Sequence, residues 1–229
     1  MKRRRKILCA FLCVLLVSLL GGCGTTFDAS GYLKALLDNS YKNDSTAFVE
    51  MKIGSANEAA ALYEQGIDAE VAAMGLSGDI GLTEEEMMLS REVFSKMLAG
   101  ARYTVGDAVL QENKDYVVTV TYEQMNVYAP TMELYLEKMA ELNTKWEDQP
   151  PTETERVKEI LMTVITCMDE ALALATYDEP ATTTVRVELT NNVYYPNDED
   201  LVKLEMVLFD TDAMSGDAEA DEAGIKSMD

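Results

Sequence analysis

The sequence predicts a single α+β domain in which a helical layer packs on one face of a four-stranded antiparallel sheet made of two hairpins. Up to residue 99 the apolar positions recur every three to four residues, which is the period of a helix, and from residue 103 a period of two appears, which is the period of a strand. Capping boxes mark three of the helix starts. Because a helix and a sheet each present one apolar face, stacking the two layers buries both faces.

Four helices are expected in the first part of the domain, at residues 29–39, 45–52, 56–74 and 84–99. Ser55 and Thr83 precede the last two, each with a glutamate three residues later that completes a capping box. Glycines between these two helices predict a turn, because glycine is too flexible to continue either helix. They are Gly75, Gly78 and Gly81.

A first β-hairpin is expected after these helices. From Tyr116 to Tyr122 two sets of side chains alternate, as in a strand with two different faces. One set is Tyr116, Val118, Val120 and Tyr122, and the other is Val117, Thr119 and Thr121. Residues 102–111 precede a turn at Asn113-Lys114. We therefore expect the two segments to pair through that turn.

Two long helices should follow the hairpin. The first starts at Pro130-Thr131, ends before Pro150-Pro151 and has an apolar stripe at spacings of three and four. The stripe consists of Met132, Tyr135, Leu136, Met139, Leu142 and Trp146. The second starts at the capping box of Thr152 and Glu155 and is expected to run to about Tyr177, near the centre of the domain.

A second hairpin is expected to close the domain, which spans residues 29–210. Its two strands lie on either side of a bend at Pro196 to Asp200. Their alternating apolar residues are Val185, Val187 and Leu189 before the bend and Val202, Leu204, Met206 and Leu208 after it. Residues 211–229 are rich in Ala, Gly, Asp and Glu and have little to bury, which predicts a disordered acidic tail.

Residues 1–22 have the pattern of a secretory signal peptide. Five basic residues, Lys2 to Lys6, precede an apolar run from Ile7 to Leu20 that contains nothing more polar than a serine and two thiols. A lasting transmembrane helix needs about 20 apolar residues. We therefore expect this shorter segment to be cleaved rather than to span the membrane.

The residues Leu20, Gly21, Gly22 and Cys23 resemble the bacterial lipobox, in which small residues precede a cysteine that takes a diacylglyceryl thioether. The resemblance implies lipidation of Cys23, with palmitate as the expected acyl chain, and makes residues 23–28 the lipidated cysteine and a short spacer. Two acyl chains are enough for stable anchoring on the extracytoplasmic face of the cell membrane. The alternative is an ordinary signal peptide with a cysteine near its cut.

The mature chain is strongly acidic. Removal of residues 1–22 takes away five of the 19 basic residues and none of the 41 acidic ones, which leaves a formal charge of −27. Such a surface repels nucleic acid, anionic headgroups and polyphosphate wall polymers, because phosphate binding needs clustered Lys and Arg. Cationic peptides, divalent ions and neutral glycans remain open as partners.

The sequence contains no familiar catalytic or metal-binding motif. Without a histidine there is no Ser-His or Cys-His pair and no histidine-containing zinc site, and phosphate loops and nucleophile elbows are also missing. Glu84–Glu86 fall in the first turn of a helix, where acidic side chains oppose the positive end of the helix dipole. The acidic run from Asp210 has Met214 and Ser215 where a calcium loop needs a ligand and a glycine. No cofactor and no metal are therefore expected.

Cys167 is expected to be a packing residue. Cys9 and Cys13 leave with the signal peptide and Cys23 is lipidated, so no disulfide can form within the mature domain. Cys167 lies on the apolar face of the second long helix, where burial would keep it a thiol rather than a nucleophile.

Three further groups of residues are open to more than one interpretation. Four tyrosines near the hairpin ends could line a glycan or peptide groove, but we favour a role in covering the sheet. They are Tyr122, Tyr128, Tyr194 and Tyr195. Several methionines could form an adaptable binding surface, although helical spacing favours core positions. A carboxylate pair for glycoside hydrolysis must lie about 5 to 10 Å apart, and the sequence cannot select such a pair from 41 acidic residues.

The lipobox, the opening Phe27 to Asp38 and the strand Tyr116 to Tyr122 together resemble uncharacterised lipoproteins of Gram-positive (Firmicutes) bacteria, a domain-of-unknown-function family. The resemblance implies a lipid-anchored surface protein. It supplies no activity, cofactor or site residues.

We therefore expect a membrane-anchored extracytoplasmic lipoprotein that acts as a non-catalytic binding or interaction module at the cell surface. Its expected partners are the membrane, through the lipid on Cys23, and an unidentified envelope protein, peptide or glycan. Two alternatives stay open. One is an enzyme that acts on cell-wall glycan through Asp or Glu, and the other is the substrate-capturing component of a transporter, which is less favoured because the chain lacks the alternating β and α units of two lobes.

Overall fold

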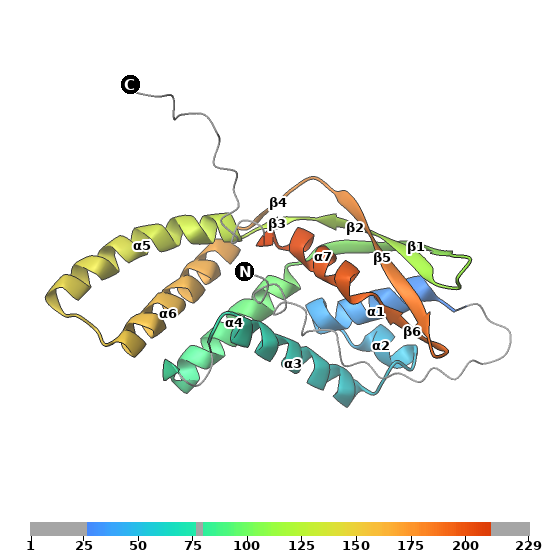
Figure 1. Cartoon of the computed structure of the whole chain (residues 1–229), viewed down its shortest axis with the longest axis horizontal. Helices are drawn as coiled ribbons and strands as arrows, with labels where there is room; N and C mark the ends of the chain where they lie inside the picture. The colour runs from blue at the N-terminus through green and yellow to red at the C-terminus, as the bar shows by residue number, and fades with distance from the viewer. Residues whose placement is uncertain (1–26, 77–79, 212–229) are drawn as a thin grey trace, which may run out of the picture.

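The computed structural model describes residues 27–76 and 80–211 (Figure 1). The helices are α1 (Ala29–Lys42), α2 (Thr46–Glu50), α3 (Ala56–Ala73), α4 (Glu84–Ala99), α5 (Tyr128–Asp148), α6 (Glu153–Leu172) and α7 (Asp198–Leu208). The strands are β1 (Arg102–Leu110), β2 (Tyr116–Glu123), β3 (Met125–Asn126), β4 (Thr176–Tyr177), β5 (Ala181–Thr190) and β6 (Val193–Pro196). The predicted signal peptide, lipobox and nearly all of the predicted acidic tail lie outside the described residues.

The N-terminal helices form where the sequence predicts them. The capping boxes that begin at Ser55, Thr83 and Thr152 are all present, and each supplies partners for backbone N–H groups that a helix start leaves free. α1 is the most deeply buried helix of this part, with nine of its 14 residues inside the core. Asp28 caps it by accepting a hydrogen bond from the backbone N–H of Gly31 at 2.9 Å.

The larger sheet is antiparallel throughout and consists of two hairpins side by side, in the strand order β1-β2-β5-β6. Val118 and Val185 pair across its centre and are fully buried, whereas the neighbouring pair of Thr119 and Thr184 is exposed. α1 and α7 pack against the strands. The predicted α+β class, with helices on one face of a four-stranded sheet, is therefore confirmed.

The second hairpin differs from its prediction. The turn lies at Asn191-Asn192 rather than at residues 196–200, and both asparagines have positive φ angles, of 52° and 64°. Positive φ at both central positions is typical of a two-residue type I′ hairpin turn, and asparagine tolerates it better than most residues. The outer strand is therefore the short β6, and the strand predicted around Val202 to Leu208 is wrong.

That segment is the helix α7. Asn197 caps it by accepting a hydrogen bond from the backbone N–H of Asp200, and three acidic residues occupy its first turn, where the helix dipole favours them. Leu201, Leu204 and Leu208 follow at spacings of three and four and are buried. The helical period of these leucines outweighs the alternation that predicted a strand.

The second long helix is shorter and less central than predicted. α6 ends at Leu172 instead of about Tyr177, because Thr176 and Tyr177 form β4, which pairs with β3. Only its second half is buried, from Ile165 onward. With α5 it forms a helical hairpin that projects from one end of the molecule (Figure 1). We call this projection, residues 132–164, the arm.

Among the described residues, no helix combines the length and the apolar character needed to cross a membrane.

Candidate functional site

The predicted lipidation site lies outside the described residues. Leu20, Gly21, Gly22 and Cys23 all precede Phe27, so the lipid anchor stays a prediction from the sequence. Within residues 27–76 and 80–211, no cluster of three or more acidic or cysteine side chains could hold a metal ion.

Cys167 is fully buried in α6, as the sequence predicts. Burial raises the pKa of its thiol above the ordinary value, because a thiolate is poorly solvated inside the protein. A buried thiol with a raised pKa is a poor nucleophile. Cys167 is therefore a packing residue.

Glu84–Glu86 serve structure rather than metal binding. All three lie in the first turn of α4. Glu86 accepts the backbone N–H of Thr83 at 2.6 Å and pairs with the Lys158 ammonium at 2.7 Å. The Lys158 and Thr83 hydrogen bonds hold the pKa of Glu86 below its usual value. This glutamate fixes the start of α4 and ties α4 to α6.

The tyrosines near the hairpin ends do not line a common groove. Tyr128 is buried and its hydroxyl points to the sulfur of Met97 at 3.6 Å. Tyr194 stacks on Phe27, with 4.1 Å between ring centroids and 13° between ring planes. Tyr122 and Tyr195 are half-buried. Packing against neighbouring side chains explains Tyr128 and Tyr194 without a ligand.

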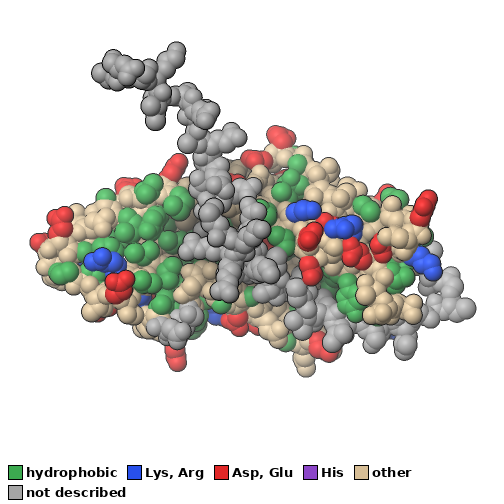
Figure 2. All heavy atoms as spheres, in the orientation of Figure 1, with side chains coloured by type: hydrophobic (Ala, Val, Ile, Leu, Met, Phe, Trp, Pro, Cys, Tyr) green, Lys and Arg blue, Asp and Glu red, His purple; other side chains and the backbone are tan. Residues whose placement is uncertain are grey.

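The arm carries an apolar surface, of which the sequence indicated the stripe of the first long helix but not its exposure. Met132, Leu136 and Met139 lie on one side of α5, and three α6 residues at spacings of three and four lie on one side of α6. We call these six residues the apolar face: Met132, Leu136, Met139, Val157, Ile160 and Val164. Leu136 is 66% exposed and Val157 39%, and the others are half-buried. Figure 2 shows hydrophobic side chains gathered over α5 and α6.

The charges around the apolar face are unbalanced. Each cation of the arm has an intramolecular partner: Lys138 pairs with Glu170, Lys145 with Glu159 and Lys158 with Glu86, and Arg156 lies over the Trp146 ring. By contrast, the exposed Glu133 and Glu137 on α5 and Glu153 on α6 make no ion pair within the part of the chain that the structure describes. The rim of the apolar face is therefore acidic.

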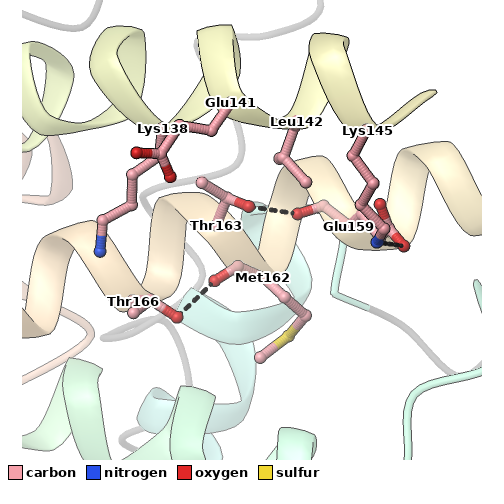
Figure 3. A pocket seen from close by; sticks show the side chains of 8 residues that line it. All are labelled: Lys138, Glu141, Leu142, Lys145, Glu159, Met162, Thr163 and Thr166. Carbon is pink, nitrogen blue, oxygen red and sulfur yellow. Dashed lines mark hydrogen bonds and ion pairs between the residues drawn. The ribbon is translucent and has the colours of Figure 1, made fainter. Parts of the chain in front are cut away.

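A pocket of about 480 Å³ lies between α5 and α6 (Figure 3). Leu142 and Met162 supply its apolar lining. Figure 3 keeps α5 above α6, as in Figure 1, but α5 runs in the opposite direction, so the two figures view the arm from opposite sides.

The polar groups of the pocket are already engaged. Lys145 and the Trp146 indole both hold Glu159, at 2.9 and 2.7 Å, and they keep the pKa of Glu159 below its usual value. The hydroxyls of Thr163 and Thr166 donate to carbonyls of their own helix. These groups make the pocket part of the α5–α6 contact rather than a site with groups ready for catalysis.

A buried pair of carboxyl groups lies elsewhere, where α3 meets α7. Glu70 is 5% exposed and Glu205 8%, and their side chains share a hydrogen bond. Burial raises the pKa of Glu70 to about 7 and that of Glu205 well above its ordinary value. Two carboxyl groups can share a hydrogen bond only if one of them is protonated. Glu205 follows Glu70 by 135 positions, which explains why no sequence pattern indicated the pair.

This pair does not resemble the site of a glycoside hydrolase. Glycoside hydrolysis needs two carboxyl groups that flank a bound sugar, separated by about 5 Å or more. Glu70 and Glu205 instead bond to each other and lie among the buried Tyr41 and Tyr128. Their contact with each other leaves no room for a substrate between them.

Comparison with known proteins supports the fold. No family model and no curated protein matches the chain. Among solved structures, the chain is similar to a crystal structure described as that of a "putative lipoprotein (ycdA)" from Bacillus subtilis subsp. subtilis str. 168, with a TM-score of 0.51 and 14% sequence identity. The match covers 80% of this chain and 56% of that chain, so this chain spans little more than half of the similar protein. At this identity the likeness concerns the fold.

Proposed function

We propose that the protein is a lipid-anchored extracytoplasmic binding module that captures a cationic amphipathic helix of an envelope protein or peptide on the apolar face of its arm. The observation that carries the proposal is the arm itself, a projecting helical hairpin whose apolar face has no cover among the described residues. Exposed apolar surfaces rimmed by polar residues commonly mark interaction sites.

The acidic residues around the apolar face favour a cationic partner. Glu133, Glu137 and Glu153 lie beside the apolar face and make no ion pair with any described residue, while every cation of the arm is engaged within the chain. A helix with an apolar stripe and flanking Lys or Arg would bury the stripe on the apolar face and supply the missing partners. A second copy of this acidic chain would instead bring acidic rims together.

The position of the arm suits a tethered receptor. The start of α1 lies at one end of the longest axis of the molecule and the arm at the other (Figure 1). A lipid on Cys23 would hold the α1 end near the membrane. The arm would then point away from the membrane, toward other components of the envelope.

Binding can be tested with two designed amphipathic helical peptides that share one apolar stripe, one flanked by Lys and the other by Glu. We expect the mature chain to bind only the Lys-flanked peptide, with an affinity that falls as salt rises. Leu136→Asp should weaken this binding about tenfold or more, whereas Met88→Asp, at a 69% exposed position on α4, should not. Equal binding of the two peptides, or binding unaffected by Leu136→Asp, would contradict the proposal.

The anchor has its own test. Cys23→Ser should abolish lipid labelling and release the protein from the membrane, because it removes the thiol that takes the diacylglyceryl group. Normal membrane retention of the unlabelled variant would show that another segment holds the protein.

A further inference from the structure

The N-terminal end of the described chain is held firmly at one end of the sheet. The Phe27 ring stacks on Tyr194 of β6 at 4.1 Å and also contacts Tyr32 of α1 and Tyr116 of β2, at centroid distances of 5.3 and 5.9 Å. Phe27 follows Cys23 by four positions, and this stretch of chain can span at most about 14 Å. A lipid on Cys23 would therefore place this end of the sheet at the membrane surface.

Both hairpin turns lie at the same end. Leu110 pairs with Tyr116 and Thr190 with Val193, so the turns at residues 111–115 and 191–192 are close to the Phe27 cluster. The Tyr194 hydroxyl donates to the Lys114 carbonyl at 3.3 Å and joins the two turns. Figure 1 shows both turns beside the start of α1, away from the arm.

Two apolar side chains are exposed just before the first turn. Val109 is 59% exposed and Leu110 56%. They are successive residues of β1, so they point to opposite faces of the strand, and one packing partner could not cover both. A surface that meets the tip of the hairpin end-on could contact both.

This end of the molecule carries few charged residues although the mature chain carries a formal charge of −27. The first turn, residues 111–115, has two acids and one base, Glu112, Asp115 and Lys114, and residues 190–193 carry no charge. The Asp115 carboxylate accepts the backbone N–H of Leu189 at 2.8 Å. The two turns together carry a net formal charge of −1, so they repel anionic headgroups only weakly.

From these observations we infer that the tip of the β1–β2 hairpin rests on the lipid surface, with Val109 and Leu110 entering the headgroup layer beside the lipid anchor. The inference depends on the proposed lipid anchor and is independent of what the arm binds. Each contact strengthens the other, because a tethered tip meets the bilayer at high effective concentration. The long axis of the molecule then points outward and the arm is held away from the membrane.

The test uses the lipidated mature chain, reconstituted in vesicles of phosphatidylcholine and phosphatidylglycerol with brominated acyl chains, which quench tryptophan. Trp146 is the only tryptophan, so the Trp146→Phe variant has no tryptophan fluorescence of its own. A single tryptophan is then introduced into the Trp146→Phe chain, by Leu110→Trp in one variant and by Leu136→Trp in another. The brominated lipid should quench the fluorescence of the tryptophan at position 110 but not that of the tryptophan at position 136 on the arm. The melting temperature of each variant verifies that it is folded.

Flotation of the vesicles separates the possible failures. If the chain floats with the vesicles but Leu110→Trp is not quenched, or is quenched no more than Leu136→Trp, the inference is wrong while the anchor stands. If the wild-type chain does not float, the proposed lipid anchor is wrong, and the inference, which depends on the anchor, is wrong as well. Preferential quenching of Leu110→Trp in floating protein supports both.

Discussion

The body of the domain and its arm are both built from amphipathic helices, yet these helices use their apolar residues differently. In α1, nine of 14 residues are buried, whereas α5 buries only Tyr128 and Thr131 of its 21, both near its start. The body encloses its apolar side chains between helices and sheet, while in the arm α5 and α6 cover each other and α4 lies beside α6. Two helices alone leave part of each stripe in solvent.

This comparison teaches that the same pattern can indicate either core or contact surface. An apolar stripe predicts that one side of a helix avoids water, but it does not indicate whether the cover comes from the same chain. In the body the cover comes from the chain itself, whereas on the arm none of the described residues covers the apolar face.

The largest expected effect separates the two regions directly. Phe94 in α4 is 1% exposed, and Phe94→Ala should lower the free energy of unfolding by about 3 to 5 kcal/mol, because it removes a buried ring and leaves a cavity. Leu136→Ala on the arm should change it by less than about 0.5 kcal/mol. Urea unfolding measures both. A loss from Leu136→Ala as large as that from Phe94→Ala would mean that the arm is covered in solution.

An intermediate effect concerns the buried carboxyl pair of the body. Because the pKa of Glu70 in the folded chain, about 7, lies above the ordinary 4.5, its contribution to stability is fully present below pH 4.5 and is lost as the pH rises toward 7. Glu205, whose pKa is also raised, extends the loss to higher pH. Glu205→Gln removes one titrating group and keeps a hydrogen bond to Glu70. It should stabilise the domain by about 1 to 3 kcal/mol at pH 8 and have little effect at pH 4.5.

Melting temperatures at pH 4.5 and pH 8 would measure this effect, with Glu137→Gln on the arm as the exposed control. The control should show no comparable dependence on pH. If Glu205→Gln destabilised the protein at both pH values to the same extent, the two carboxyl groups would not share a proton in the folded state.

The smallest expected effect lies on the arm. Glu159→Gln weakens the ion pair with Lys145 but leaves an acceptor for the Trp146 indole, so the free energy of unfolding should fall by less than about 1 kcal/mol. Trp146 is the only tryptophan, and its fluorescence reports on the arm. We expect the fluorescence transition in urea to shift to lower concentration while the far-UV circular dichroism transition stays in place. A joint shift of both signals would show that arm and body unfold together.

Local patterns predicted most of the body. Capping boxes at Ser55, Thr83 and Thr152 mark real helix starts, and the alternation from Tyr116 to Tyr122 marks a real strand. These features succeed because their interactions span only a few residues. The burial of Cys167 followed from its position on a helical face in the same way.

The errors come from segments where two periods fit the same residues. Leu204 and Leu208 satisfy both an alternating and a helical spacing, and the Asn197 cap with the acidic first turn decides for the helix. A correct prediction was available from that cap. The end of α6 was not, because β4 exists only through its pairing with β3, some fifty residues earlier in the chain.

The candidate sites were the least predictable. The stripes of α5 and α6 were visible in the sequence, but their incomplete cover depends on where the arm lies relative to the body. The contact between Glu70 and Glu205 depends on the packing of α3 near α7. Such sites arise from tertiary structure, and a single sequence does not encode them as a local pattern.

The Phe27 cluster also has a mechanical consequence. In a protein tethered by its N-terminus, a pull on the tether passes along the chain into the folded domain. Phe27 passes such a load to α1, β2 and β6 at once, through Tyr32, Tyr116 and Tyr194. Pulling on the anchor would therefore strain three elements of the core together, and α1 could not be drawn out of the domain until this aromatic cluster had come apart.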